Sequence, residues 1–239
     1  MKLLDLTLPS PAENLALDEA LLEAAEAGEL NDDVLRLWEF QAPAVVVGRS
    51  SRVAEEVHLE AARAAGISVL RRASGGASIV AGPGCLMYSV VLKYEGREHL
   101  RLLDEVHRHV LGKVLSSLAP LTPGAEHAGT SDLALAGRKF SGNSLRCKRD
   151  NLLYHGTLLY DFDLTLIGRF LKMPPRQPSY RGDRQHSDFV SNLGLSSAAL
   201  RQALAAAFNA QQPLSFWPLV RTRQLTDSRY SQDPWNLQR

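Results

Sequence analysis

Apolar and polar positions along the chain follow two patterns, one typical of helices and one typical of strands. In residues 14–26 the apolar positions Leu15, Leu21, Leu22 and Ala25 form a stripe with acidic residues between them, which predicts an amphipathic helix. Similar patterns predict further helices at 55–65, 102–118, 163–171 and 196–209. Short apolar runs bounded by turn residues predict strands at 34–40, 44–47, 67–70, 78–80, 86–93, 132–135, 139–143 and 152–160.

The order of these elements predicts one domain across residues 1–239, without internal repeats or a linker. We expect an α/β (α+β) fold in which helices flank a mixed, largely antiparallel sheet. Residues 120–129 are rich in turn formers and are predicted to be a loop. Residues 174–187, with three prolines and Gly182, are predicted to be an irregular surface loop.

Composition narrows the class of protein. With 239 residues, of which 45% are hydrophobic and 22% charged, the chain can bury a substantial core, and its net charge of +1 gives no basis for bulk nucleic-acid binding. No apolar stretch approaches the roughly 20 residues that cross a bilayer, and the amino terminus lacks a leader pattern, so we expect a cytoplasmic protein without a membrane partner. Cys85 and Cys147 do not form a disulfide framework, and no closely spaced Cys and His residues suggest zinc.

Two segments combine cations with turns made of small residues. The first, RRASGGASIV at 71–80, places two arginines before a Ser-Gly-Gly turn, where backbone N–H groups and a guanidinium fork can hold a phosphate or carboxylate. The second, GRKFSGNS at 137–144, puts Lys139 beside another Ser-Gly turn and is followed by HGTLL at 155–159. Together they favour a nucleotide or an acyl phosphate as ligand.

With these segments the sequence resembles the lipoate-protein ligase A family, part of the biotin/lipoate protein ligase superfamily. The resemblance extends over nearly the whole chain and keeps the family's order of motifs. Its further motifs are NLALDEALL from Asn14, VVVGR from Val45, Glu56, Asp132-Leu133 and RYSQDPWN from Arg229. The resemblance implies the catalytic-domain fold of that superfamily. It also implies an enzyme that uses ATP and Mg²⁺ to activate lipoate as lipoyl-adenylate, and transfers the lipoyl group to a lysine of a lipoyl domain. The acceptor would be of the 2-oxoacid dehydrogenase E2 or glycine cleavage H protein type.

The resemblance assigns roles to individual residues. Lys139 would be the catalytic residue and would act through its charge on the acyl-adenylate, not as a nucleophile. Asp132 would help to hold Mg²⁺ or a lysine near the phosphate. Substrate and ATP would be bound by Arg72, Ser74, Gly75, Gly76, Ala77, Ser78, Ile79, Val80, Asp132, Lys139, Ser141, Gly142, His155, Gly156 and Thr157.

These positions also have ordinary structural interpretations. On local sequence alone, the Ser-Gly-Gly segment is more typical of a simple turn and Lys139 of a solvated strand lysine. His155 is interpreted as a buried imidazole that orients the hairpin rather than as a proton donor. Asp132 could also be a strand-end carboxylate. The family resemblance is what favours the functional interpretation of the loop and the lysine.

Two other functions stay open. An octanoyltransferase would take octanoate from acyl carrier protein without ATP and hold it as a thioester, for which Cys147, beside Arg146 and Lys148, is the candidate nucleophile. Residues 120–130 and the chain after Cys147 lack the cysteines that transferase branches use, which favours the ligase. A non-catalytic lipoate-binding module is the other alternative, and biotin is a weaker candidate ligand.

Several positions depart from the ligase pattern. Where the family often has His-Asp and Gly-Asn, residues 81–82 are Ala-Gly and residues 84–85 are Gly-Cys, which removes polar groups that would face the nucleotide. Phe189 stands where the family has an arginine. The chain stops soon after Trp235-Asn236, without the accessory domain of many bacterial ligases, so a separate accessory subunit is a candidate partner. The sequence leaves open the acceptor, the choice between lipoate and octanoate, and the oligomeric state.

Overall fold

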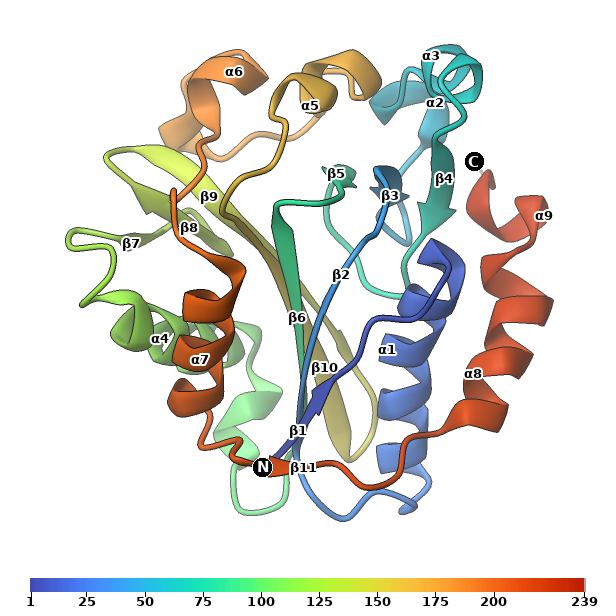
Figure 1. Ribbon diagram of the computed structural model, residues 1–239, viewed down its shortest axis with the longest axis vertical. Helices are drawn as coiled ribbons and strands as arrows, with labels where there is room; N and C mark the ends of the chain where they lie inside the picture. The colour runs from blue at the N-terminus through green and yellow to red at the C-terminus, as the bar shows by residue number, and fades with distance from the viewer. Residues whose placement is uncertain (239) are drawn as a thin grey trace.

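The computed structural model describes residues 1–238, which form two sheets covered by helices (Figure 1). Within these residues, the larger sheet has eight strands in the order β11-β1-β2-β6-β10-β9-β8-β7, and the smaller has three in the order β4-β3-β5. The strands are β1 Lys2–Asp5, β2 Val34–Glu39, β3 Ala44–Val47, β4 Ser68–Arg71, β5 Ile79–Ala81, β6 Cys85–Lys93, β7 Glu126–Ala128, β8 Asp132–Leu135, β9 Arg138–Cys147, β10 Asn151–Leu159 and β11 Gln212–Pro213. In the large sheet, β1 is parallel to β2 and β11 while the other pairs are antiparallel, which confirms the predicted sheet type.

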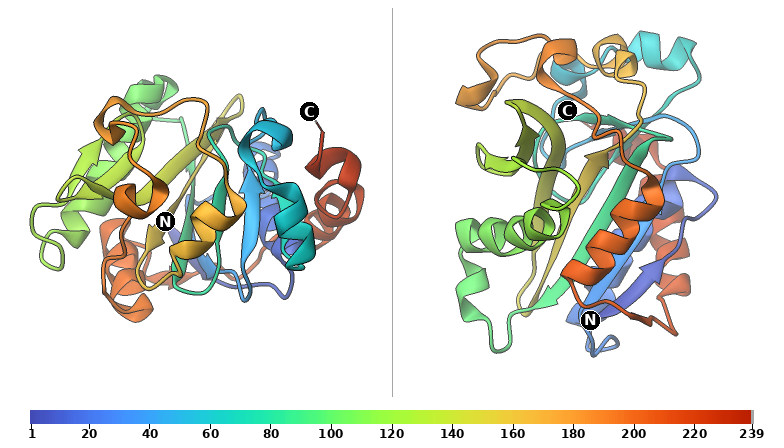
Figure 2. Two further views of the ribbon diagram at one scale, coloured as in Figure 1. Left: turned by 90° about the horizontal axis from the view of Figure 1, so that it is seen from above. Right: turned by 60° about the vertical axis from the view of Figure 1, so that its left-hand side comes forward.

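Helices cover both faces of the large sheet. In Figures 1 and 2, α1 and α8 lie on one side of it and α4 and α7 lie on the other. The helices, including two 3-10 turns and the π-helical turn η3, are α1 Pro11–Glu26, α2 Val53–Glu56, α3 Leu59–Ala64, η1 Glu98–Arg101, α4 Leu103–Leu118, α5 Thr165–Phe170, η2 Ser179–Arg181, α6 His186–Phe189, α7 Ser197–Ala207, α8 Leu219–Leu225, η3 Thr226–Tyr230 and α9 Asp233–Asn236.

Alternation along the central strands separates these two helical layers. Leu35 of β2 and Tyr154 of β10 pack in the apolar cluster formed with α4 and α7. Their neighbours Val34 and Leu153 pack in the cluster formed with α1. Because successive side chains of a strand point to opposite faces, the large sheet carries an apolar layer on each side.

Helix α1 begins at Pro11 rather than at the predicted residue 14. Ser10 Oγ accepts a hydrogen bond from the Glu13 N–H, and the Glu13 carboxylate accepts one from the Ser10 N–H, which together form a capping box. Proline is favoured directly after such a cap because its missing N–H has no partner there in any case. The helix therefore starts where its cap is, before the apolar stripe begins.

The helix predicted at 55–65 is instead two short helices, α2 and α3. Val57 between them has extended backbone and forms an isolated antiparallel bridge with Leu171. The N–H of His58 donates to the carbonyl of Phe170 at 2.9 Å. Pairing with a segment more than a hundred residues away therefore interrupts a helix that local sequence favours.

Other differences concern short elements that local patterns indicate weakly. The predicted loop 120–129 contains β7, which pairs with β8 at the edge of the large sheet. The predicted loop 174–187 contains η2 and the start of α6. The strand predicted at 78–80 is β5, which belongs to the small sheet. Beyond these differences, the pattern analysis missed β1, β11, α8, η3 and α9.

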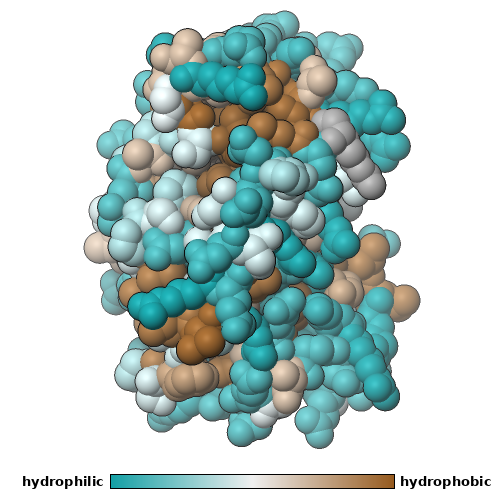
Figure 3. Space-filling view, turned by 90° about the vertical axis from the view of Figure 1, so that its right-hand side faces the viewer, coloured by the Kyte–Doolittle hydropathy of each residue, from teal (hydrophilic) through white to brown (hydrophobic). Residues whose placement is uncertain are grey.

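The last helices, from α8 to α9, run beside α1 and finish next to β4 (Figure 1). The face seen from this side is mostly hydrophilic, with apolar side chains gathered near its upper end and along its lower edge (Figure 3). Among the helices of residues 1–238, none combines the length and the apolar character needed to span a bilayer.

Candidate functional site

Two adjoining cavities lie between the Ser-Gly-Gly loop of the small sheet and the β9–β10 hairpin of the large one. The first has a volume of about 150 Å³ and the second of about 380 Å³. Both cavities are lined by Ala77, Ser78, Ile79, Asp132, Lys139, Gly142, Thr157, Arg176 and Pro178. The two segments singled out in the sequence thus meet in one place.

Lys139 stands at the boundary of the two cavities. Its ammonium lies 2.7 Å from Asp132 Oδ1, and the side chains are 27% and 11% exposed. The lysine folds back along its own strand over Gly142, where an added Cβ would lie 2.9 Å from the Lys139 Nζ. A glycine at this position therefore leaves the space that the lysine occupies. Of the two roles predicted for Asp132, the structure shows the one in which it holds a lysine.

Arg72 holds the Ser-Gly-Gly loop together from inside. Its guanidinium donates to the carbonyls of Gly75 at 3.0 Å, Ala77 at 3.0 Å and Val46 at 3.3 Å. Burial lowers its pKa to about 10, while the charge of Glu56 opposes this shift, so the group is still a cation at neutral pH. Arg72 lines the second cavity, but the donors described here are used on carbonyls of the loop and of β3.

Of the two arginines before the turn, Arg72 lines the second cavity, whereas Arg71 belongs to neither cavity lining formed by residues 1–238. Arg71 is fully buried and points away from the cavities, where it donates to Gly48 O at 2.7 Å and to Trp235 O at 3.0 Å. The Trp235 Nε1–H donates in return to the Arg71 carbonyl at 2.9 Å. Consecutive residues of an extended strand face opposite sides, which is why the two guanidinium groups separate.

Glu56 occupies a donor pair that the sequence had suggested for a ligand. One oxygen of its carboxylate accepts from the Ser78 N–H at 2.7 Å and from the Ser78 Oγ–H at 2.8 Å. Glu56 lines the first cavity together with Ser78. The Ser78 N–H therefore fixes the loop to α2 in this structure.

Two positions around the loop require glycine, one because of a close backbone contact and the other because of its backbone conformation. An added Cβ at Gly48 would lie 1.8 Å from the carbonyl oxygen of Gly76. Gly76 has a φ of +86°, in the left-handed region that glycine adopts most easily. Ser144 Oγ donates to Gly75 O at 2.9 Å, which joins the loop to β9.

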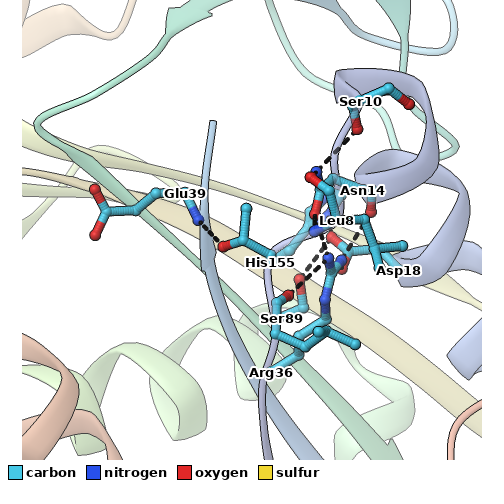
Figure 4. A network of polar contacts seen from close by, with 10 residues as sticks. Leu8, Ser10, Asn14, Asp18, Arg36, Glu39, Ser89 and His155 are labelled. Atoms are coloured by element: carbon cyan, nitrogen blue, oxygen red, sulfur yellow. Dashed lines mark hydrogen bonds and ion pairs between the residues drawn. The ribbon is translucent and has the colours of Figure 1, made fainter. Parts of the chain in front are cut away.

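A chain of buried polar groups lies behind the loop. Ser74 Oγ is 2.5 Å from His155 Nε2, and His155 Nδ1 is 3.3 Å from Asp18 Oδ2. Arg36 donates to Asp18 Oδ1 at 2.5 Å and to the Asn14 side chain at 2.7 Å, and Figure 4 shows these groups converging from α1, β2 and β10. His155 is bonded on both ring nitrogens, in keeping with its interpretation as an orienting imidazole.

The charge of Arg36 stabilises the Asp18 carboxylate in this hydrogen-bonded network, because Asp18 is almost fully buried. Burial by itself would raise the pKa of Asp18, but Arg36 and the hydrogen bonds from His155 and Ser89 outweigh it and hold the pKa below its usual value. Asp18 is therefore a carboxylate at neutral pH. Ser74 contacts His155, which contacts Asp18, but Ser74 is only 1% exposed and is therefore too enclosed to act as a nucleophile.

The remaining predicted residues complete the walls. Thr157 lines both cavities, and its Oγ1 accepts from the Gly142 N–H at 3.3 Å. Gly156 lines the second cavity, and a Cβ there would lie 1.7 Å from Asn143 Oδ1. Val80 and Ser141 line the first cavity. Ser74 and Gly75 belong to neither lining described here and instead connect the loop to His155 and Ser144.

Cys147 does not share this site. It ends β9, pairs with Leu152 and is exposed, and it is outside the cavity linings formed by residues 1–238. Arg146, its neighbour on the strand, forms an ion pair with Glu19. Cys85 lines the first cavity, but burial, followed by the charge of Glu39, raises its pKa, so it is a thiol and not a thiolate.

The residues around Asp132 do not fit a resident Mg²⁺ site. Its Oδ1 is engaged by Lys139, and its Oδ2 accepts from the Tyr180 hydroxyl at 2.9 Å. Across residues 1–238, no cluster of three or more acidic, His or Cys side chains is arranged to hold a metal.

Sequence reasoning missed several lining residues. Leu15, Trp38 and Met87 line the second cavity, and Arg181 and Phe189 line the first. Tyr180 reaches Asp132 from the segment 174–189. The apolar side chains carry no local signal, since they look like ordinary core positions. The cation-rich run from Arg176 to His186 was a signal, but it was interpreted only as a surface loop.

Comparison of the sequence with known families gives one match over most of the chain. The family of the lipoyl protein ligase A/B catalytic domain matches residues 10–209. A probable lipoate-protein ligase A of Mycoplasma pneumoniae is 34% identical over 72% of this chain and 50% of its own length. The chain therefore spans about half the length of that relative. The octanoyltransferase LipM of Symbiobacterium thermophilum is 30% identical over 97% of this chain and 95% of its own length.

Comparison with solved structures shows the same fold. A lipoate-protein ligase A bound with ATP has a TM-score of 0.84 at 24% identity, covering 99% of this chain and 98% of that one. A bipartite lipoate protein ligase of Thermoplasma acidophilum, studied with its E2 lipoyl domain, has a TM-score of 0.83 at 24% identity, covering 100% of this chain and 97% of that one.

Proposed function

Because the chain belongs to the family of lipoyl protein ligase A/B catalytic domains, we propose that it is an ATP-dependent lipoate-protein ligase. It forms lipoyl-adenylate from lipoate and ATP, and then transfers the lipoyl group to a lysine of a lipoyl domain. The observation that carries this proposal is the position of Lys139, which lines two adjoining cavities at once. A reaction that joins two different substrates needs such a shared charged group where they meet.

The second cavity suits the acyl chain of lipoate. Part of its wall is formed by the apolar residues Leu15, Trp38, Val46 and Met87, contributed by α1, β2, β3 and β6. Removal of an alkyl chain and a dithiolane ring from water into such a wall is favourable by roughly 25 cal/mol per Å² of apolar surface. The carboxylate end of lipoate then lies toward Lys139.

The first cavity suits the nucleotide. Apolar side chains such as Ile79, Val80 and Phe189 offer a surface for the base. Three cations line the same cavity and favour phosphate, namely Lys172 and, from the segment 174–189, Arg176 and Arg181. ATP enters as its magnesium complex, so the metal belongs to the substrate.

The chemistry proceeds in two displacements. In the first, a lipoate carboxylate oxygen attacks the α-phosphorus of ATP, and pyrophosphate leaves with its electron pair. In the second, the acceptor lysine amine attacks the acyl carbon, loses a proton, and AMP leaves. Negative charge develops on phosphate oxygens and then on the acyl oxygen, both beside the shared boundary, where Lys139 stabilises it.

The proposal is tested by mass spectrometry of a lipoyl domain incubated with the protein, lipoate and ATP-magnesium. An ATP-dependent mass increase of one lipoyl group on the acceptor supports it. Absence of lipoyl-adenylate and of modified acceptor, with a well-folded protein and lipoyl domains of both the E2 and the H protein type, contradicts it.

Gly142→Ala is predicted to damage activity far more than stability. The new Cβ would lie 2.9 Å from the Lys139 Nζ, so the lysine side chain must move. Because this side chain is flexible, it can move with little strain, and stability should change little. A displacement of about 1 Å in a reacting group lowers rates by about 10²-fold. Adenylation rates and urea unfolding measure the two effects.

Gly112→Ala in α4 is the matched control, because an added Cβ there meets no atom within 4 Å among the described residues. It should leave adenylation unchanged and raise helix stability by up to about 1 kcal/mol. An active Gly142→Ala protein would show that the position of Lys139 is not important.

The similarity to LipM over nearly the full length of both chains favours octanoyl transfer as the second candidate function. That reaction needs a thiolate near the acyl site, and Cys147 lies away from both cavities. We therefore predict that Cys147→Ser keeps the full ATP-dependent ligation rate. Octanoyl transfer from acyl carrier protein without ATP, abolished in Cys147→Ser, would establish the transferase instead.

A further inference from the structure

We propose that Tyr180 is a positioning residue: its hydroxyl fixes the Asp132 carboxylate, and thereby the ammonium of Lys139, when the segment 174–189 covers the first cavity. This inference rests on the proposed function, because it concerns the lysine of that reaction. It assigns to the covering segment a task beyond contact with the nucleotide.

The first observation is that Asp132 is shared between two parts of the chain. Its Oδ1 faces Lys139 of β9 at 2.7 Å, and its Oδ2 accepts from Tyr180 of η2 at 2.9 Å. A carboxylate with a single partner can turn about its terminal torsion, which is broad in energy. A second donor on the other oxygen restricts that rotation, and it restricts the lysine with it.

The second observation is that Tyr180 is itself held. Its ring packs against Phe189 with centroids 5.1 Å apart, and its carbonyl accepts from Arg184 at 2.8 Å. On the other side the ring lies over Gly129, where an added Cβ would come within 3.4 Å of it. Burial, with the charge and hydrogen bond of Asp132, raises the pKa of Tyr180, so its hydroxyl remains a donor at neutral and mildly alkaline pH.

The third observation is that the segment is fastened to the hairpin that carries the lysine. Arg184 donates to Gly137 O at 3.0 Å, and Arg138 donates to Val190 O at 2.7 Å. The Ser191 N–H donates to the Lys139 carbonyl at 2.9 Å. The side chain of Lys139 is thus tied to Tyr180 through Asp132, and its backbone is tied to Ser191. When the segment covers the cavity, it therefore also fixes the position of the lysine.

The test compares Tyr180→Phe with Tyr160→Phe. Both tyrosines donate to a carboxylate, since the Tyr160 hydroxyl lies 2.8 Å from Glu39 Oε2, but Tyr160 is outside both cavity linings described here. We expect Tyr180→Phe to lower kcat of adenylation by about tenfold, with KM for ATP and lipoate nearly unchanged, because only transition-state stabilisation is lost. Tyr160→Phe should keep the wild-type values.

A double-mutant cycle distinguishes positioning from a general structural role. If Tyr180 acts through Lys139, Tyr180→Phe should have no further effect on the residual single-turnover rate of a Lys139→Ala protein. An independent tenfold loss in that background would overturn the proposal.

A second readout does not depend on ligase activity. Acetylation of the Lys139 amine by an N-hydroxysuccinimide ester, followed by peptide mass spectrometry, should be faster in Tyr180→Phe than in wild type and unchanged in Tyr160→Phe. Equal labelling in all three proteins would overturn the positioning role. If the labelling rates of the three proteins follow this order but the wild-type protein makes no lipoyl-adenylate, only the proposed function is overturned.

Discussion

Lys139→Ala is expected to lower the rate of lipoyl-adenylate formation by about 10²–10³-fold, because removal of a preorganised group aimed at developing charge costs about 2.7–4 kcal/mol. The rate of the second displacement, from adenylate to acceptor lysine, should fall by a similar factor, since Lys139 lines both cavities. Folding should be little affected, because the ion pair with Asp132 is partly exposed and such pairs contribute about 0–1 kcal/mol. Pyrophosphate exchange, single-turnover transfer and urea unfolding measure the three quantities.

Lys113→Ala in α4 provides the control, because it removes an equal charge from a helix on the opposite side of the large sheet from α1. It should adenylate lipoate at the wild-type rate. Near-normal adenylation by Lys139→Ala would remove the electrostatic role assigned to this residue, whatever the result with the acceptor.

Arg36→Met is expected to lower the free energy of unfolding by about 3–5 kcal/mol, because it leaves a buried carboxylate without its main partner. Arg36 is fully buried and donates to Asp18, to the Asn14 side chain and to the Asn14 carbonyl, the last at 2.7 Å. It therefore joins β2 to the first turns of α1. Arg52→Met is the control, since the Arg52 ion pair with Glu55 is exposed and contributes about 0–1 kcal/mol.

The effect of Arg36→Met should depend on pH in a defined direction. In wild type the pKa of Asp18 is lowered: burial opposes the shift, but Arg36, His155 and Ser89 outweigh it. The resulting stability is present above the unfolded pKa of about 3.9 and is lost as pH falls through the folded value. Without Arg36, burial should raise that pKa above the unfolded value. The difference in unfolding free energy between the two proteins should therefore shrink as pH falls from about 7 to about 4, and a constant difference would contradict this account.

Much of the fold follows from the sequence because its elements are built on local signals. The short, mostly apolar runs of β2, β6 and β10 reflect packing on two faces, so these strands were predicted within one or two residues. The capping box at Ser10 has a sequence signature, Ser-Pro-Ala-Glu, which marks the true start of α1. The break at Val57 had no local signal, since the bridge to Leu171 forms only in the folded chain.

The site was predictable to the extent that its residues lie in two motifs. Lys139, Ser78 and Thr157, which lie in those motifs, line the cavities. The opposite directions of Arg71 and Arg72 follow from strand geometry and could have been predicted. The positions of Trp38 and Tyr180 could not, because distant elements carry them to the site and neither has a distinctive neighbourhood in the sequence.

The two halves of the site belong to different sheets, each with its own strand ladder among the described residues. The Ser-Gly-Gly loop and the β9–β10 hairpin meet through side chains, such as Ser144 on Gly75 and His155 on Ser74. Each such bond contributes only about 0.5–1.5 kcal/mol, far less than a strand ladder. The contact between the loop and the hairpin can therefore open while both strand ladders, and the apolar core that the two sheets share, stay intact. In amide hydrogen exchange, loop amides should open independently of the strands on either side.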